Sequence, residues 1–108
     1  MELKEIKENL ILACLNQNPK IFLPYLLSNN VKTTMPNKIR FYSFFKYMIN
    51  CGKQKSIGNW ALKIEKTTLM NEQHIKAYNF YDNKHKSARL KVLVIEENNE
   101  ITIETIPF

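Results

Sequence analysis

The chain has 108 residues, of which 44% are hydrophobic, and a formal net charge of +6. This length fits one domain over residues 1–108, and the hydrophobic content can fill a core, which argues against an intrinsically disordered chain. Residues 1–5 are acidic where a signal peptide would be basic, and the longest early apolar run, residues 10–15, is short. We therefore expect a cytoplasmic protein without a secretory or membrane-spanning segment.

Positive charge is concentrated in the first part of the chain. Residues 9–64 contain no Asp or Glu, so this half should produce a positive field. Such a field can attract an anionic partner or nucleic acid, whereas a biased base composition favouring Lys, Asn and Ile would give the same excess without any partner. Most of the cations are Lys and the aromatic residues lie at core spacing, so we do not expect nucleic acid as a partner.

The first half of the chain predicts helices and one short strand. Apolar residues recur at helical spacing over residues 2–16, and the Asn-Pro pair at residues 18–19 is typical of the start of a second helix, which should end at Leu27. Pro24 should shorten or bend that helix because it removes a backbone hydrogen bond. Residues 31–34 alternate β-branched and polar side chains and could form a brief strand.

A third helix is predicted to start at residues 35–37, a Met-Pro-Asn sequence, and to run to about Asn50. We expect Gly52 to end it in a left-handed conformation. Its apolar residues cover more than half of its circumference, so it should lie across a sheet with the first helix beside it. Residues 53–59 form a predicted loop, in which Gly58 provides the turn into the next strand.

Residues 60–108 predict four strands joined by polar turns at residues 71–73, 82–86 and 97–100. Pairing about these turns places Tyr78 opposite Leu90, Phe80 opposite Ala88 and Ile64, and Val94 opposite Ile103. One face of the sheet is then apolar, and it carries Trp60, Leu62, Ile64, Tyr78, Phe80, Ala88, Leu90, Val92, Val94, Ile101 and Ile103. We therefore predict the α+β class, with a curved antiparallel four- to five-stranded sheet wrapped around the N-terminal helices.

The element order is helix, helix, short strand, helix and four-stranded meander. It contains the segments NPKIFLPYLLSNNV (18–31), NKIRFYSFFKYMI (37–49) and SARLKVLVIEENNEITIETI (87–106). In this order and these segments the chain resembles the nuclear transport factor 2-like superfamily, which includes SnoaL-like and ketosteroid-isomerase-like proteins with a cystatin-like fold. The resemblance implies a cone of bent sheet around a helix, an apolar pocket inside it, and dimers through the outer sheet face. The superfamily holds enzymes, binding proteins and assembly domains, so the fold does not give the function.

A small-molecule-binding domain is the function that this pattern favours, with a small apolar or weakly acidic ligand inside the cone. The expected ligand-binding residues are Tyr25, Tyr42, Phe45, Trp60, Ile64, Lys76, Tyr78, Phe80, Leu90 and Val92. The aromatic residues among them would equally serve as core packing. Lys66, Thr68 and Lys76 should cluster at the pocket mouth, where they could meet a carboxylate, or else form a solvated end of the sheet.

An enzyme of isomerase, dehydratase or hydrolase type is the first alternative, with Asp82 or His74 as the catalytic candidates, and a basic partner- or nucleic-acid-binding module is the second alternative. Asp82 and Glu96 are the only acids expected on the inner face, and both lie at strand ends, so neither is an obvious buried base. We expect no metal and no cofactor, because His74 and His85 are predicted to lie far apart. Cys14 and Cys51 are expected near helix C-termini, where a thiolate is disfavoured, as a reduced pair.

The outer face of the sheet is predicted to carry an apolar centre of Ala77, Leu93, Ile95 and Ile106. Charged residues surround this centre: Lys63, Glu65, Arg89, Lys91 and Glu104. An apolar centre inside a polar rim is typical of protein interfaces, so we expect a homodimer through this face. The alternative is an open sheet with scattered surface aliphatic residues.

Overall fold

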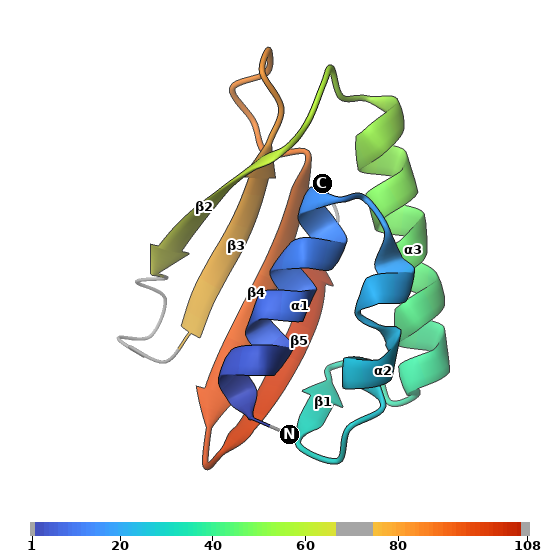
Figure 1. Cartoon of the computed structure of the whole chain (residues 1–108), viewed down its shortest axis with the longest axis vertical. Coiled ribbons are helices and arrows are strands. Elements are labelled where there is room, and N and C mark those ends of the chain that lie inside the picture. The colour runs from blue at the N-terminus through green and yellow to red at the C-terminus, as the bar shows by residue number, and fades with distance from the viewer. Residues whose placement is uncertain (1, 67–74, 107–108) are drawn as a thin grey trace.

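The computed structural model describes residues 2–66 and 75–106, and in these residues it is an α+β fold with helices on one face of a five-stranded mixed sheet (Figure 1). The helices are α1 (Leu3–Leu15), η1 (Pro19–Ile21, a 3-10 helix), α2 (Leu23–Leu26) and α3 (Lys38–Gln54). The strands are β1 (Val31–Thr33), β2 (Ala61–Lys66), β3 (Ile75–Tyr81), β4 (Leu90–Glu97) and β5 (Glu100–Ile106). No helix in these ranges combines the length and the apolar character needed to cross a bilayer.

The strand order is β1-β5-β4-β3-β2, and the meander from β2 to β5 is antiparallel as predicted. The prediction of a wholly antiparallel sheet is wrong, because β1 pairs parallel to β5, with Val31 opposite Ile101 and Thr33 opposite Ile103. Helix α3 follows β1 in the chain and packs against β1, β4 and β5. The wrapping of the sheet into a cone stays a prediction.

The pairing of β3 with its neighbours differs from the prediction by two residues. Phe80 lies opposite Leu90 of β4 and Leu62 of β2, in place of the predicted Ala88 and Ile64. The connection between β3 and β4 spans residues 82–89 and is longer than the predicted turn. A shift of two residues keeps every side chain on its predicted face, because side chains alternate along a strand.

The two-residue shift affects the pairing of β4 with β3 but not with β5. Tyr78 lies opposite Val92, in place of the predicted Leu90, whereas the predicted pair of Val94 with Ile103 is confirmed. The two-residue turn between β4 and β5 is also confirmed, since Asn98 and Asn99 have φ angles of 52° and 59°. Two successive positive φ angles are the requirement of a tight hairpin turn, and Asn tolerates them better than most residues. The predicted turn at residues 71–73 lies outside the described residues.

The predicted helix starts are confirmed by their caps. The Asn37 side chain accepts hydrogen bonds from the backbone N–H groups of Ile39 at 2.8 Å and Arg40 at 3.3 Å. The Asn18 side chain accepts one from the N–H of Lys20 at 3.3 Å. Each bond satisfies a donor that the first helical turn leaves without a partner. The predicted second helix is divided at Phe22 into η1 and α2, and Pro24 lies in the first turn of α2, where its missing N–H is tolerated.

The prediction that Gly52 ends the third helix is wrong, because α3 continues through it to Gln54. Gly52 is needed there for close packing. A Cβ at this position would lie 2.6 Å from the carbonyl oxygen of Arg89 and 2.9 Å from Cζ2 of Trp60. The left-handed glycine is Gly58, with φ of 80°, which provides the predicted turn before β2.

The core lies between the helices and the inner face of the sheet. Three phenylalanine rings fill its centre: Phe22 and Phe45 have ring centroids 6.0 Å apart, and Phe41 stacks on Phe45 at 5.9 Å. They pack with other fully buried residues, which are Ile6, Leu10, Leu26, Ile49, Phe80, Leu90, Val92, Ile101 and Ile103. The helices therefore cover the middle of the sheet, whereas edge strand β2 is mostly exposed.

Candidate functional site

Most of the predicted ligand-binding residues belong to the packed core. The buried ones are Phe45, Trp60, Tyr78, Phe80, Leu90 and Val92, each at most 5% exposed. The partly buried ones are Tyr25, Tyr42 and Lys76, whereas Ile64 on β2 is 49% exposed. None of these ten residues lines either of the two cavities described below. Their burial fits the alternative that they pack the core.

The larger cavity, of about 270 Å³, lies between the last turns of α3 and the β3–β4 loop (residues 82–89). We call it the α3–loop cavity. Its lining residues are Met48, Cys51 and Gly52 of α3, Lys55 directly after α3, and Ser87, Ala88 and Arg89 of the loop. A smaller cavity of about 230 Å³ is lined by Thr34, Met35, Phe41, Phe44, Glu104 and Thr105.

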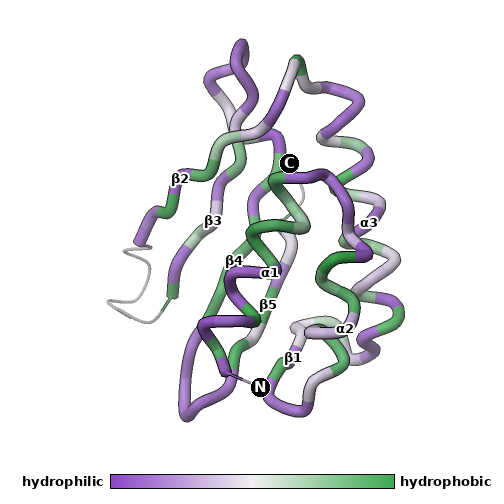
Figure 2. Tube along the Cα trace, viewed as in Figure 1, coloured by the Kyte–Doolittle hydropathy of each residue, from purple (hydrophilic) through white to green (hydrophobic). Residues whose placement is uncertain are grey.

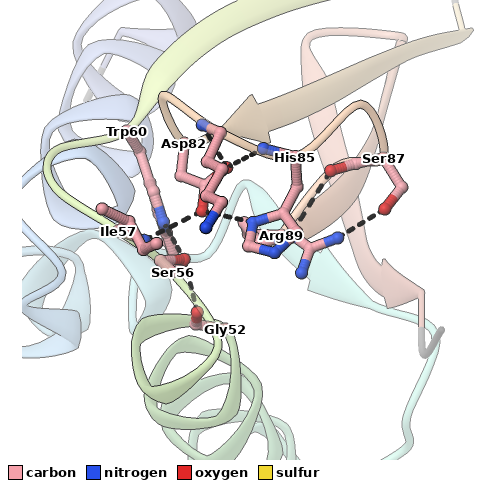
Figure 3. Close-up of polar contacts among 9 residues, drawn as sticks. Gly52, Ser56, Ile57, Trp60, Asp82, His85, Ser87 and Arg89 are labelled. Atoms are coloured by element: carbon pink, nitrogen blue, oxygen red, sulfur yellow. Dashed lines mark hydrogen bonds and ion pairs between the residues drawn. The ribbon is translucent and has the colours of Figure 1, made fainter.

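The helix side of the α3–loop cavity is shaped by a hydrogen-bonded link between Trp60 and the end of α3 (Figure 3). The indole Nε1 of Trp60 donates to Ser56 Oγ at 2.7 Å, and Ser56 Oγ donates to the Gly52 carbonyl oxygen at 2.5 Å. The indole also contacts Phe80, with ring centroids 6.2 Å apart. Because Gly52 has no side chain, the indole and the backbone of Arg89 both approach the helix closely.

The loop side is organised by the carboxylate of Asp82, whose side chain is fully buried. Oδ1 accepts the backbone N–H groups of Lys84 at 3.2 Å and His85 at 2.8 Å. Oδ2 accepts the backbone N–H of Ile57 at 2.9 Å and lies 2.8 Å from His85 Nδ1 (Figure 3). Burial alone would raise the pKa of Asp82, but the hydrogen bonds from His85, Ile57 and Lys84 lower it well below its ordinary value.

These bonds make Asp82 an anchor that ties the β3–β4 loop to the loop after α3. Its low pKa and its filled hydrogen-bonding capacity argue against a role as a catalytic base. The other predicted catalytic candidate, His74, lies outside the described residues, as does Thr68. The second predicted inner-face acid, Glu96, forms an ion pair with Lys7 of α1.

The contact of Asp82 with His85 was not predicted from the sequence. The signal that could have revealed it is the Asp-Asn-x-His spacing at a turn, because Asp side chains accept N–H groups two and three residues later. Within residues 2–66 and 75–106, no group of three His, Cys, Asp or Glu side chains could hold a metal ion.

The segments that form the α3–loop cavity are rich in cations. Lys55 and Arg89 line it, and further cations on the same two segments are exposed: Lys53, Lys84 and Lys86. In the part of the chain that the structure describes, none of these five side chains forms an ion pair. Figure 2 shows the hydrophilic β3–β4 loop at one end of the molecule and the hydrophilic β4–β5 hairpin at the other.

The opposite end is the acidic one. Glu96, Glu97 and Glu100 belong to the β4–β5 hairpin, where Lys7 pairs with Glu96 and Lys32 pairs with Glu100 at 2.8 Å. The eight residues of β4 separate the β4–β5 turn at residues 98–99 from the β3–β4 loop, a distance of roughly 25 Å at about 3.3 Å per residue. The cations at the cavity are therefore well separated from these acids.

The two cysteines differ in their surroundings. Cys51 is partly exposed and lines the α3–loop cavity, whereas Cys14 is fully buried in the core. Burial raises the pKa of the Cys14 thiol far above its ordinary value. Both are free thiols, as the sequence led us to expect.

Comparisons of this chain with family models, with curated proteins and with solved structures gave no match. The relation to the nuclear transport factor 2-like superfamily therefore stays a prediction.

Proposed function

We propose that this chain is a small-molecule-binding domain whose ligand occupies the α3–loop cavity. The observation that carries the proposal is a recess of about 270 Å³ with apolar walls from Met48, Gly52 and Ala88 and polar groups at its edge. Concave apolar sites with a few convergent polar groups are typical of ligand binding. The site lies beside the core and not inside it, which differs from the location expected from the sequence.

The cavity volume limits the ligand. It is about nine times the ~30 Å³ that one water molecule occupies in the liquid. This lies just below the usual range of drug-sized pockets, about 300 to 1,000 Å³. We propose a ligand whose buried part is about the size of one six-membered ring and which is apolar or weakly acidic.

Membership of the nuclear transport factor 2-like superfamily is part of this proposal. Its support is the order of two helical segments, a short strand, a long helix and a four-stranded meander, with the helices on one face of the sheet. A cytoplasmic location is proposed with it.

Binding is tested by titrating the ¹⁵N-labelled chain with benzyl alcohol and with benzoate in two-dimensional NMR. We expect shift changes at the amides of Gly52 and Ala88 with at least one of the two probes. The variant Ala88→Phe places a ring in the recess and should abolish these changes while the rest of the spectrum stays folded. Shift changes confined to other regions, or none with either probe, would remove the proposal.

We also propose a homodimer through the outer face of the sheet. Ala77 lies opposite Leu93, and Ile75 lies opposite Ile95, so aliphatic side chains adjoin across β3 and β4. Ala77 is 5% exposed, so the contact surface would come from the partly exposed Ile75, Leu93 and Ile95. In the described residues the helices lie on the other face (Figure 1). Charged side chains surround this centre, namely Lys63, Glu65, Lys91 and Glu104, and acids and bases there can pair across a twofold axis.

Light scattering at micromolar concentration tests the dimer. We expect twice the chain mass of 12.8 kDa, and a return to the single-chain mass in Leu93→Lys, because a charge at the centre of an apolar contact is costly. Lys91→Glu is a matched control at the rim and should leave the mass doubled. A single-chain mass for the unmodified protein would exclude the dimer.

A further inference from the structure

We infer that the ligand of the α3–loop cavity is a small organic anion, with an apolar body in the recess and a carboxylate or phosphate group held by Lys55 and Arg89. This inference rests on the proposed function and specifies the ligand class. Its basis is that cations from two separate segments, Lys55 directly after α3 and Arg89 of the β3–β4 loop, converge on one recess with apolar walls.

The positive field at the cavity is not cancelled locally. Residues 50–60 and 82–91 contain one acid, Asp82, and its buried carboxylate is already engaged with backbone N–H groups and His85. The acids of the β4–β5 hairpin lie roughly 25 Å away, which is about three times the Debye length of ~8 Å at physiological ionic strength. An anion at the cavity therefore meets a net positive environment.

Arg89 is positioned to act as the anion's main partner. Its Nε donates to the Ser87 carbonyl oxygen at 3.3 Å, and its Nη2 donates to Ser87 Oγ. A guanidinium has five N–H donors, so these bonds orient the group and leave three N–H donors for a ligand. A planar, partly immobilised guanidinium suits the two oxygens of a carboxylate or phosphate group.

The end of α3 opposes anion binding, and the two effects can be compared. A helix C-terminus carries about half a negative elementary charge. Lys55 and Arg89 each carry a full positive charge, and the exposed Lys53 adds a third nearby. The cations therefore outweigh the helix end, and the anionic group is expected on the loop side of the recess, next to Arg89.

The test compares three probes that share one ring: benzoate, phenyl phosphate and benzyl alcohol. Affinity is measured by NMR titration, and also by protection of Cys51 from alkylation by iodoacetamide. A charge-assisted hydrogen bond contributes about 1.5 to 3 kcal/mol, so the two anions should bind roughly tenfold or more tightly than the alcohol. Which anion binds more tightly distinguishes a phosphate ligand from a carboxylate ligand, and either order supports the inference.

Charge-neutral variants locate the contact. Arg89→Gln and Lys55→Gln should each weaken anion binding several-fold and leave benzyl alcohol binding unchanged. Lys53→Gln is the matched control, because it removes the same charge two residues from Lys55, in the last turn of α3, at a residue that does not line the cavity. Raising the salt concentration should weaken the binding of both anions.

Equal affinity for all three probes, or anion binding that Arg89→Gln leaves intact, would overturn the inference while the proposed function stands. Failure of all three probes to bind would overturn both. If Lys53→Gln weakens anion binding as much as Arg89→Gln does, the anion responds to the general positive field. That result would also overturn the inferred contact of the anion with Arg89.

Discussion

Replacing Trp60 by alanine tests how α3, the loop after it and the sheet are held together. The indole is 5% exposed, contacts Phe80 and lies against Gly52, and its N–H donates to Ser56. One side chain thus connects the inner face of the sheet with the last turns of α3. Its removal affects the core and the wall of the α3–loop cavity together.

The expected loss follows from the area that the indole buries. A buried Trp removes about 150 to 250 Å² from water, which at about 25 cal/mol per Å² corresponds to about 4 to 6 kcal/mol. Alanine keeps the Cβ and the surroundings relax in part, so Trp60→Ala should lower the free energy of unfolding by about 3 to 5 kcal/mol. Domains of this size have a total stability of about 5 to 15 kcal/mol, so a large share would be lost.

The measurement is urea unfolding followed by far-UV circular dichroism, since the variant lacks the tryptophan that fluorescence would use. Two control variants separate the contribution of the aromatic ring from that of the indole N–H. Trp60→Phe keeps an aromatic ring without the N–H, and Ser56→Ala removes the acceptor, which should cost about 0.5 to 1.5 kcal/mol. A loss below about 1 kcal/mol for Trp60→Ala would refute the packing described here, because no buried indole is removed so cheaply.

Three further predictions concern the same region and the core. In an open helix Gly52→Ala would raise the free energy of unfolding by about 1 kcal/mol. Here the new Cβ would lie within 3.0 Å of Arg89 and Trp60, so urea unfolding should show a net loss of about 1 to 2 kcal/mol in the free energy of unfolding. A gain in stability would contradict the close approach. Ellman's reagent should react with one thiol in the folded chain, Cys51, and with Cys14 only after unfolding, because burial raises the pKa of the Cys14 thiol; two fast thiols would be the contrary result. The pKa of Asp82 is depressed in the folded chain, so the stability that its carboxylate contributes is complete above about pH 4 and is lost as the pH falls below that value. The thermal unfolding temperature of Asp82→Asn should therefore depend less on pH in this acidic range than that of the unmodified chain. An unchanged pH dependence would exclude the anchor role.

Features set by neighbouring residues were predictable from the sequence. The caps at Asn18 and Asn37 and the turn at residues 98–99 depend on side chains that bond or tolerate the local backbone, so their residue types identify them. The apolar face of the sheet was also predictable, because side-chain alternation keeps its parity even when the pairing of β3 with β4 shifts by two residues.

Features set by contacts between distant segments were not predictable. The length of the β3–β4 loop depends on the hydrogen bond that the Asp82 carboxylate accepts from the backbone N–H of Ile57, 25 positions earlier. The residue types of the turn do not indicate that bond. Gly52 resembled a helix terminator, yet its role depends on Arg89 and Trp60, which reach it only in the folded chain. The α3–loop cavity is lined by α3 and by the β3–β4 loop, which are far apart in the sequence, so the sequence analysis placed the ligand in the core instead.

The positions of the charged residues also depend on contacts between distant segments. The absence of acids from residues 9–64 could follow from base composition alone, and on that explanation the lysines need have no common location. The fold brings only part of that segment to the α3–loop cavity: Lys55 lines it with Arg89 of the β3–β4 loop, whereas Lys32 pairs with Glu100 at the acidic end. The antiparallel meander returns the β4–β5 turn to the start of α1, where Glu96 pairs with Lys7. The cations at the end of α3 and in the β3–β4 loop are left together at the other end, without acids to pair with. A biased base composition and an anion-binding function at this end of the molecule are therefore compatible. A loss of anion affinity in Arg89→Gln would support anion binding, and no change would leave base composition as the explanation.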